Sequence, residues 1–207
     1  MVMKNMETSE KLLKKKAWIK EEITRRRPDI SEMVWKEAHT VLDDILSRYK
    51  DIPKGERMHT DGYIFPSAAV YLTLKKYIGS RDAYDIIESS AVKKSTEAGK
   101  SLAKLMRIPG MKSLFVKVWD PMTRKMFGPE NGFRNVFYPR KKGEYRMDVI
   151  SCPYFRYFTE LGCPEITKIF CENDDRIYGC LPGLKFLRTG TLGKGAEKCD
   201  FRMKKEE

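Results

Sequence analysis

The sequence predicts an α+β fold, with a helical N-terminal half packed on a small antiparallel sheet and two short inserted helices. Two observations support this prediction. Apolar residues recur at helical spacing up to about Gly128, and from Gly132 onward short stretches alternate like strands between turns that contain glycine. With 207 residues and 41% hydrophobic content, the chain is long enough for one domain with a helical extension.

Two helices are expected before residue 50. The stretch from Ser9 to Arg27 carries apolar residues at helical spacing, and Pro28 ends it because proline cannot continue a helix. A clearer apolar stripe follows and reaches Tyr49, with Ser31 as its cap.

The next helical region begins at Pro66, which favours the first turn of a helix, and Gly79 closes it as a C-cap. Apolar residues occupy more than one side of this helix, so it should be largely buried. Another helix is expected over residues 80–106. Residues 109–128 keep helical spacing despite Pro121, which predicts a kinked or broken helix.

Two pairs of strands are expected in the C-terminal part. FRNVFYP and YRMDVIS alternate in polarity and flank a turn with Gly143, which is typical of a β-hairpin. LKFLRTG and KCDFRM predict two more strands, joined by a glycine-bearing turn. On the last strand, alternation should direct Cys199 and Phe201 to one face, and Asp200 becomes an edge or turn partner.

The two short inserted helices are opened by Pro153 and Pro164. Each proline directly follows a cysteine, so Cys152 and Cys163 fall where a helix N-cap would lie. The positive end of a helix dipole lowers the pKa of a thiol at that position. The pattern therefore predicts two candidate thiolates.

The five cysteines contain no C-x-x-C pair, which argues against a zinc finger or ribbon. An odd number of cysteines also favours free thiols over a disulfide framework. The sequence predicts no cofactor and no metal ligands, although the thiols leave a thiolate-bound metal open.

The net charge of +12 raises the question of nucleic-acid binding. Acidic residues lie close to the basic clusters, so a solvated basic surface is the favoured interpretation, and an anionic small molecule would also be attracted to it. No apolar run approaches the roughly 18 residues of a membrane span, and the N-terminus lacks the apolar core of a secretory signal. We therefore expect a cytoplasmic protein that binds neither nucleic acid nor membranes.

Four further residues are candidates for chemistry. His59 is one of only two histidines and precedes the buried helix in a loop, where a general base or a structural role would suit it. Cys171, Asp174 and Asp175 share one face if the second inserted helix lasts that long.

The run CPYFRYFTELGCPEITKIFCENDD, followed by LKFLRTGTLGKGAEKCDFR, resembles the signature of the L-2-amino-thiazoline-4-carboxylic acid hydrolase family. The segment HTDGYIFPSAAVYLTLKKYIG is similar to an N-terminal helical region of the same family. The resemblance covers roughly Arg57 to Met203. It divides the chain into an N-terminal helical extension, residues 1–56, and a hydrolase-like α+β domain, residues 57–207.

The resemblance implies hydrolysis of a cyclic amidine, in which water adds at C2 of an aminothiazoline and the ring opens to N-carbamoyl-cysteine. Cys152 is the expected nucleophile, and either Asp174 or Asp175 would hold the amidinium. The expected substrate is a small carboxylate, which Arg188 would clamp with its planar guanidinium. Further expected site residues are His59 and Cys171, in catalytic roles, and Thr189, Thr191 and Cys199, in substrate binding.

Each of these assignments has a structural alternative. Cys171 and Cys199 could simply be packed, because free cysteine is among the most buried residue types. The aspartates could be a helix stop, and Arg188 a surface residue of a strand. At the level of the whole protein, the late cysteines also look like those of small-ligand sensing domains related to vinyl reductases, which bind without turnover. Homo-oligomerisation is left open.

Overall fold

The computed structural model describes residues 8–139 and 141–206 and confirms the α+β class. Its α-helices are α1 (Ser9–Lys14), α2 (Ala17–Arg26), α3 (Ser31–Arg48), α4 (Arg57–His59), α5 (Phe65–Met106), α6 (Met111–Met126), α7 (Pro153–Glu160) and α8 (Thr167–Tyr178). A π-helical turn, η1 (Thr60–Ile64), joins α4 to α5. The short 3₁₀ turns are η2 (Pro129–Asn131), η3 (Pro164–Ile166) and η4 (Leu192–Lys194).

The sheet has four antiparallel strands in the order β1-β2-β4-β3. Its strands are β1 (Arg134–Phe137), β2 (Glu144–Ser151), β3 (Leu184–Leu187) and β4 (Cys199–Lys205). Both predicted strand pairs are therefore present. The central pairing of β2 with β4 sets Val149 opposite Cys199, which places the last cysteine beside the end of the predicted hairpin.

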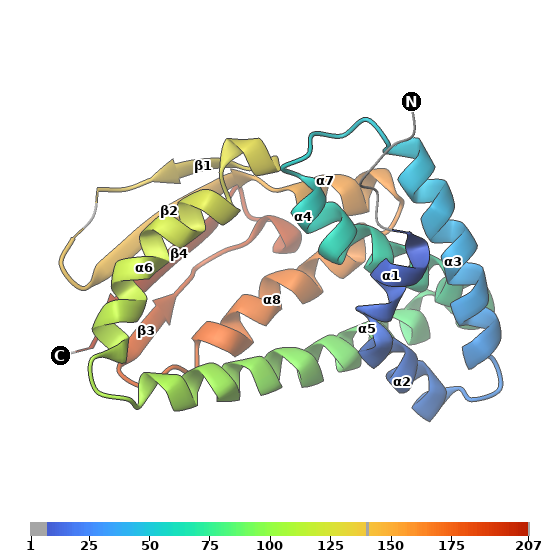
Figure 1. Ribbon diagram of the computed structural model, residues 1–207, viewed down its shortest axis with the longest axis horizontal. Helices are drawn as coiled ribbons and strands as arrows, with labels where there is room; N and C mark the ends of the chain where they lie inside the picture. The colour runs from blue at the N-terminus through green and yellow to red at the C-terminus, as the bar shows by residue number, and fades with distance from the viewer. Residues whose placement is uncertain (1–7, 140, 207) are drawn as a thin grey trace.

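Two hydrophobic clusters build the interior. One joins α1–α3, the first half of α5, α7 and the start of α8, and the other lies between the sheet and α6. Figure 1 shows this division, with α1, α2 and α3 around one end of α5 and the sheet with α6 at the other. Tyr154, on α7, packs against both clusters.

The N-terminal residues contradict one prediction, because the single helix expected over Ser9 to Arg27 is two helices, α1 and α2, which meet at a bend formed by Lys15 and Lys16. No proline or glycine marks this bend, so tertiary packing overrides the local helical preference. Ser31 is also not the cap of α3. It is the first residue of that helix, and its hydroxyl lies 2.6 Å from the Thr24 Oγ1.

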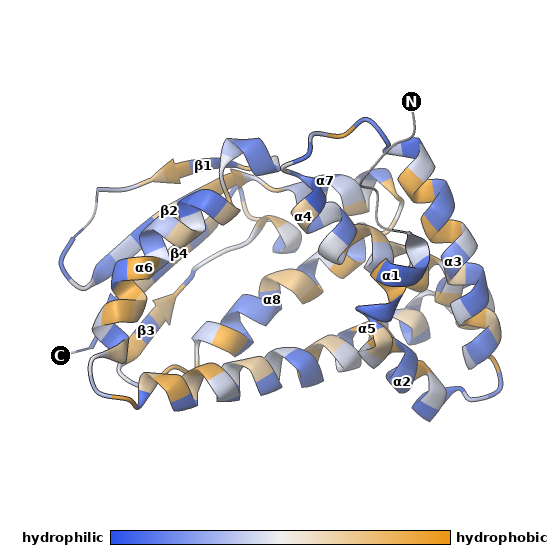
Figure 2. Cartoon of the chain, viewed as in Figure 1, coloured by the Kyte–Doolittle hydropathy of each residue, from blue (hydrophilic) through white to orange (hydrophobic). Residues whose placement is uncertain are grey.

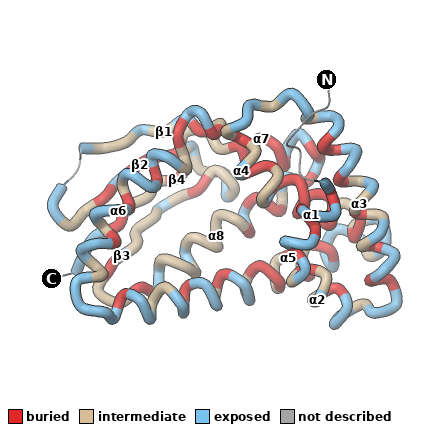
Figure 3. Tube along the Cα trace, viewed as in Figure 1, coloured by how far each residue is buried: buried red, intermediate tan, exposed pale blue. Residues whose placement is uncertain are grey.

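Gly79 divides α5 as predicted. Its φ of 79° and ψ of 169° are not helical, and two helical segments meet there at a kink. A residue with a side chain adopts that positive φ only with strain. Along the second half of α5, hydrophilic and apolar residues alternate (Figure 2), as do exposed and buried ones (Figure 3), which is the pattern of a helix covered on one face. In α6 the helix continues through Pro121.

Within residues 8–139 and 141–206, none of the helices combines the length and the apolar character that crossing a lipid bilayer requires.

Candidate active site

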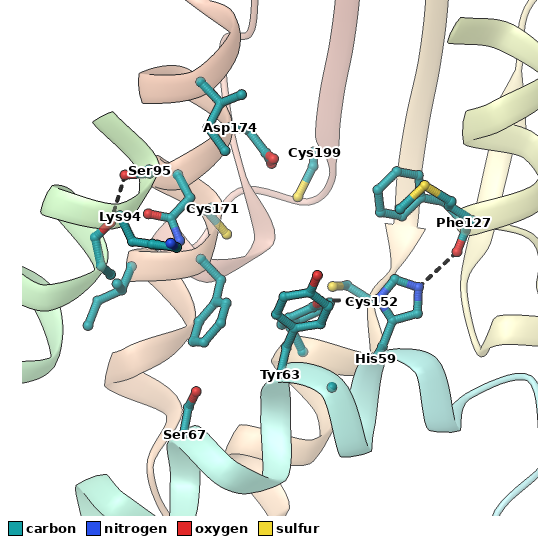
Figure 4. A pocket seen from close by; sticks show the side chains of 18 of the residues that line it. His59, Tyr63, Ser67, Lys94, Ser95, Phe127, Cys152, Cys171, Asp174 and Cys199 are labelled. Atoms are coloured by element: carbon teal, nitrogen blue, oxygen red, sulfur yellow. Dashed lines mark hydrogen bonds between the residues drawn. The ribbon is translucent and has the colours of Figure 1, made fainter. Parts of the chain in front are cut away.

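A cavity of about 710 Å³ lies between the two hydrophobic clusters, and its lining draws on both. This volume falls within the range of small-molecule sites. Figure 4 shows that the labelled side chains converge on it from several elements, with Cys171 and Asp174 on α8, Cys152 next to α7 and Cys199 on β4.

Six of the nine residues expected to form the site line this cavity: His59, Cys152, Cys171, Asp174, Arg188 and Cys199. The other three, Asp175, Thr189 and Thr191, do not line it. Phe201 lines it together with Cys199, so the alternation expected on the last strand is confirmed.

The centre of the site is a pair of thiols, Cys171 and Cys199. The pKa of the Cys171 thiol is lowered, chiefly because its sulfur accepts a hydrogen bond from Cys199. The backbone N–H of Gly193 and the positive charge of Arg188 act in the same direction, against the effect of burial. The same hydrogen bond raises the pKa of Cys199, whose sulfur also accepts the Leu192 N–H at 3.2 Å. Within this pair, the thiolate form is therefore favoured on Cys171 and the thiol form on Cys199.

The acidification expected at the two Cys-Pro steps is wrong. Cys152 does precede α7 in an extended N-cap conformation, but burial raises its pKa to about 12, and backbone hydrogen bonds at the helix start only partly oppose this. Cys163 precedes only the three-residue turn η3, and burial raises its pKa to about 12 as well. Desolvation of the thiolate outweighs the dipole of a short helix here.

Asp174 is the acidic group of the cavity. Removal from water raises its pKa to about 7, although the charge of Arg188 acts to lower it. The Nη1 of Arg188 lies 3.2 Å from the Asp174 Oδ2, and its Nη2 binds Asp175 and donates to the Cys171 carbonyl oxygen at 2.6 Å. The Arg188 side chain is only 4% exposed. Its guanidinium is thus engaged by the protein rather than open to the cavity.

The loop between β3 and β4 is shaped to approach Cys171 closely. A Cβ on Gly193 would lie 2.9 Å from the Cys171 Sγ, so only glycine fits there without displacement. The carboxylate of Asp200 fixes the start of the loop by accepting the backbone N–H groups of Thr189 and Gly190, each at 2.9 Å. Asp200 is therefore a turn partner, as predicted. Thr191 is buried, and its carbonyl oxygen accepts two N–H bonds inside the same loop.

His59 lies in α4 rather than in a loop, and it is 2% exposed. Its Nε2 donates to the Met126 carbonyl oxygen at 2.8 Å, so its Nδ1 accepts from the Tyr154 hydroxyl at 3.1 Å. Burial lowers the pKa of His59. Both ring nitrogens are used, which makes this a neutral histidine that orients Tyr154 on the cavity wall.

Several lining residues were not predicted, among them Lys16, Tyr63, Lys94, Tyr154 and Asn173. Tyr154 and Asn173 are neighbours of residues that the sequence did single out, and proximity to Cys152 and Asp174 is the signal that would have found them. Tyr63 belongs to the π-helical turn η1. Such turns are frequent at functional sites, but no sequence pattern predicted this one.

Among the residues that the structure describes, no three His, Cys, Asp or Glu side chains are grouped so that they could hold a metal ion. The cysteines lining the cavity have no disulfide partners, because all five cysteines of the chain are free. The chemistry available from the described side chains is that of a thiolate, a carboxyl of raised pKa and hydroxyl donors.

Fold and site together define a small α+β protein with a cavity of small-molecule size, in which a cysteine of lowered pKa lies near a carboxyl of raised pKa. The chain belongs to the L-2-amino-thiazoline-4-carboxylic acid hydrolase family, whose family model matches residues 57–203. This match confirms the resemblance over the span expected for it. The family name describes a hydrolase of a thiazoline carboxylate. Comparisons with curated proteins and with solved structures give no significant match.

Proposed function

We propose that this protein hydrolyses L-2-amino-thiazoline-4-carboxylate to N-carbamoyl-cysteine by opening the ring of the cyclic amidine. The observation that carries the proposal is the placement of Cys171 and Asp174 one helical turn apart on α8, both lining the cavity. Their pKa values are shifted in opposite directions, so that one is a thiolate while the other keeps its proton to near neutral pH. Opposed pKa shifts of this kind are a mark of acid and nucleophile pairs.

In the first step, the Cys171 thiolate forms a bond to C2, the carbon between the ring sulfur and the two nitrogens of the protonated amidine. The bond between C2 and the ring sulfur breaks, its electron pair stays on the sulfur, and Asp174 donates its proton there. The substrate now carries a free thiol. Its C2 is held on Cys171 as an isothiouronium group, and Asp174 is a carboxylate.

In the second step, the Asp174 carboxylate takes a proton from water while the water oxygen bonds to C2. The bond from C2 to the Cys171 sulfur then breaks, and its electron pair restores the thiolate. The remaining proton on the new oxygen passes to solvent, which leaves the carbamoyl group. One water molecule is consumed and both side chains return to their starting states.

The Cys199 thiol supports this cycle because its S–H donates to the Cys171 sulfur and stabilises the negative charge both before attack and on departure. Cys152 contributes a neutral thiol to the wall, since its pKa is about 12. The nucleophile that we propose is therefore Cys171, whereas the sequence led us to expect Cys152.

The test is to incubate the purified protein with the aminothiazoline acid in ¹⁸O-water and to follow free thiol and product mass together. We expect one free thiol and one ¹⁸O atom, in the carbamoyl oxygen, for each substrate opened. The Cys171→Ala variant should lose turnover, and Asp174→Asn should lose about 10²- to 10⁴-fold in kcat. Cys180→Ala is the matched control, because Cys180 is exposed and does not line the cavity.

Two outcomes would contradict the proposal. Binding of the compound by wild-type protein without release of thiol would favour a ligand-binding domain without turnover. Wild-type turnover by Cys171→Ala would overturn the assignment of the nucleophile while leaving the reaction in place.

A further inference from the structure

Lys16 is a buried lysine on the wall of the same cavity. It occupies the bend between α1 and α2, and only 5% of the residue is exposed. Its Nζ lies 4.5 Å from the centre of the Tyr63 ring and 5.7 Å from that of Trp18, and both rings line the cavity. Lys16 precedes residues 57–203, so it comes from outside the family match.

Among the described residues, this ammonium has aromatic neighbours but no acidic partner. Across residues 8–139 and 141–206, no carboxylate forms an ion pair with Lys16. Burial lowers its pKa to about 8, and the charge of neighbouring Lys15 adds to this effect. Buried charges in proteins are normally paired or hydrogen-bonded, because removing an ion from water is costly. A cavity wall with such a cation is therefore suited to bind an anion.

The bend that holds Lys16 is firmly anchored. Leu13 before it and Ile19 after it are fully buried, and they belong to the same hydrophobic cluster as Phe65 and Val70 of α5. The backbone of Lys16 is fixed as well, because its N–H donates to the Leu13 carbonyl oxygen at 2.7 Å and its own carbonyl accepts the Ile19 N–H at 2.8 Å. The backbone position from which the Lys16 side chain extends is thus set by the core.

The charges of the cavity match a molecule with two different ends. Asp174 and Cys171 lie together on α8, whereas Tyr63, which Lys16 contacts, rises from the helical turn facing them across the cavity (Figure 4). Lys15 and Lys94 also line the cavity, which adds further positive charge. Arg188, in contrast, is already held by Asp174 and Asp175.

We propose that Lys16 binds the carboxylate of the substrate across the cavity from Asp174, so that the N-terminal segment supplies the specificity for an acidic cyclic amidine. This inference rests on the proposed function, since it names the residue that recognises one end of the same substrate. An aromatic pair around the ammonium excludes water and thereby strengthens its interaction with a carboxylate.

The experiment compares two compounds, the aminothiazoline carboxylate and 2-amino-2-thiazoline, which lacks the carboxylate, on the full chain. Both turnover and binding by calorimetry are measured for wild type, Lys16→Met and Lys16→Arg. The control is Lys14→Met, which removes the same charge from an exposed residue two positions earlier that does not line the cavity.

We expect Lys16→Met to weaken binding of the carboxylate compound about 10- to 100-fold and to raise its KM similarly, as for loss of one charged hydrogen bond. Binding of the compound without a carboxylate should not be weakened, and Lys16→Arg should restore part of the preference for the carboxylate compound. Lys14→Met should behave as wild type. If Lys16 were merely structural, Lys16→Met would instead weaken the binding of both compounds equally. That result would overturn the inference.

The two proposals fail in different ways. If wild type turns over both compounds and Lys16→Met keeps the full preference for the carboxylate, the role of Lys16 is wrong and the hydrolase stands. If wild type opens neither ring but Lys16→Met selectively loses binding of the carboxylate compound, the hydrolase is wrong and the role of Lys16 stands. Absence of binding of both compounds to wild type overturns both.

Discussion

Arg188 and Asp174 form an ion pair on the cavity wall, with the Nη1 of the arginine 3.2 Å from the Oδ2 of the aspartate. The same guanidinium binds Asp175 and the Cys171 carbonyl oxygen, so one buried cation ties the end of β3 to three residues of α8. This arrangement fixes the geometry between the thiolate and the carboxyl. It also explains why the guanidinium is not open to a ligand.

Replacing Arg188 by glutamine should therefore destabilise the protein. Loss of one partner of a buried ion pair costs about 3–5 kcal/mol, and we expect about 2–3 kcal/mol because the side chain of Asp175 is about half exposed to solvent. Urea denaturation measures the change. Arg202→Gln is the control, since Arg202 pairs with Glu144 at the surface and its replacement should change stability far less. Equal effects of the two substitutions would contradict this account of Arg188.

The hydrogen bond from Cys199 predicts the reactivity of Cys171. Because Cys199 stabilises the thiolate, Cys199→Ala should raise the pKa of Cys171 towards the ordinary value of about 8.5. The pH dependence of iodoacetamide labelling, resolved for each cysteine by mass spectrometry, measures it. At pH 7, Cys171 should be labelled in wild type and Cys152 should not, since the pKa of Cys152 is about 12. An unchanged pH dependence of Cys171 labelling in the variant would show that Cys199 does not stabilise the Cys171 thiolate.

Asp174 makes stability depend on pH. Its folded pKa of about 7 is above the unfolded value of about 3.9, so the folded state binds the proton more tightly. Its contribution is fully present below about pH 4 and is lost as the pH rises through 7. Relative to Asp174→Asn, wild-type protein should therefore lose stability between pH 4 and 7. Thermal unfolding of both proteins across this interval tests the sign, and a constant difference would contradict the raised pKa.

Lys16 makes substrate binding depend on pH in the alkaline range. With a pKa of about 8 in the free protein, its amine loses the positive charge above that pH and no longer attracts a carboxylate. We expect kcat/KM for the carboxylate substrate to fall above pH 8. The ratio of kcat/KM for the carboxylate substrate to that for the analogue without a carboxylate isolates this effect, because titration of the catalytic groups affects both compounds. A ratio that does not change between pH 7 and 9.5 would contradict the claim that the positive charge of Lys16 attracts the substrate carboxylate.

The secondary structure was largely predictable, because strong local signals mark its boundaries. Gly79 shows why such signals work, since a positive φ requires the residue type that the sequence displays. The bend at Lys15 and Lys16 shows where they fail. Nothing local interrupts the helix there, and the break arises only because residues on both sides are buried in a core that includes α3 and α5.

The sequence allowed us to predict several residues that line the cavity, but not their pKa values. Cys171 and Asp174 were identified from helical spacing and Arg188 from the family resemblance, and the three residues do lie together. The pKa of Cys152 was predicted in the wrong direction, since sequence shows the helix dipole but not the burial that opposes it. Lys16 was missed for the same reason: its environment is made by residues distant in the sequence.

The buried residues of α1 and α2 belong to the same hydrophobic cluster as those of α5, so this cluster extends across the start of the family match. Leu12, Leu13, Ile19 and Ile23 are at most 1% exposed, and all four precede residue 57, where the family match begins. A chain shortened to the matched region would leave the apolar side of α5 bare to water and prone to association. The segment ahead of the matched region thus supplies both cover for the core and part of the wall of the cavity.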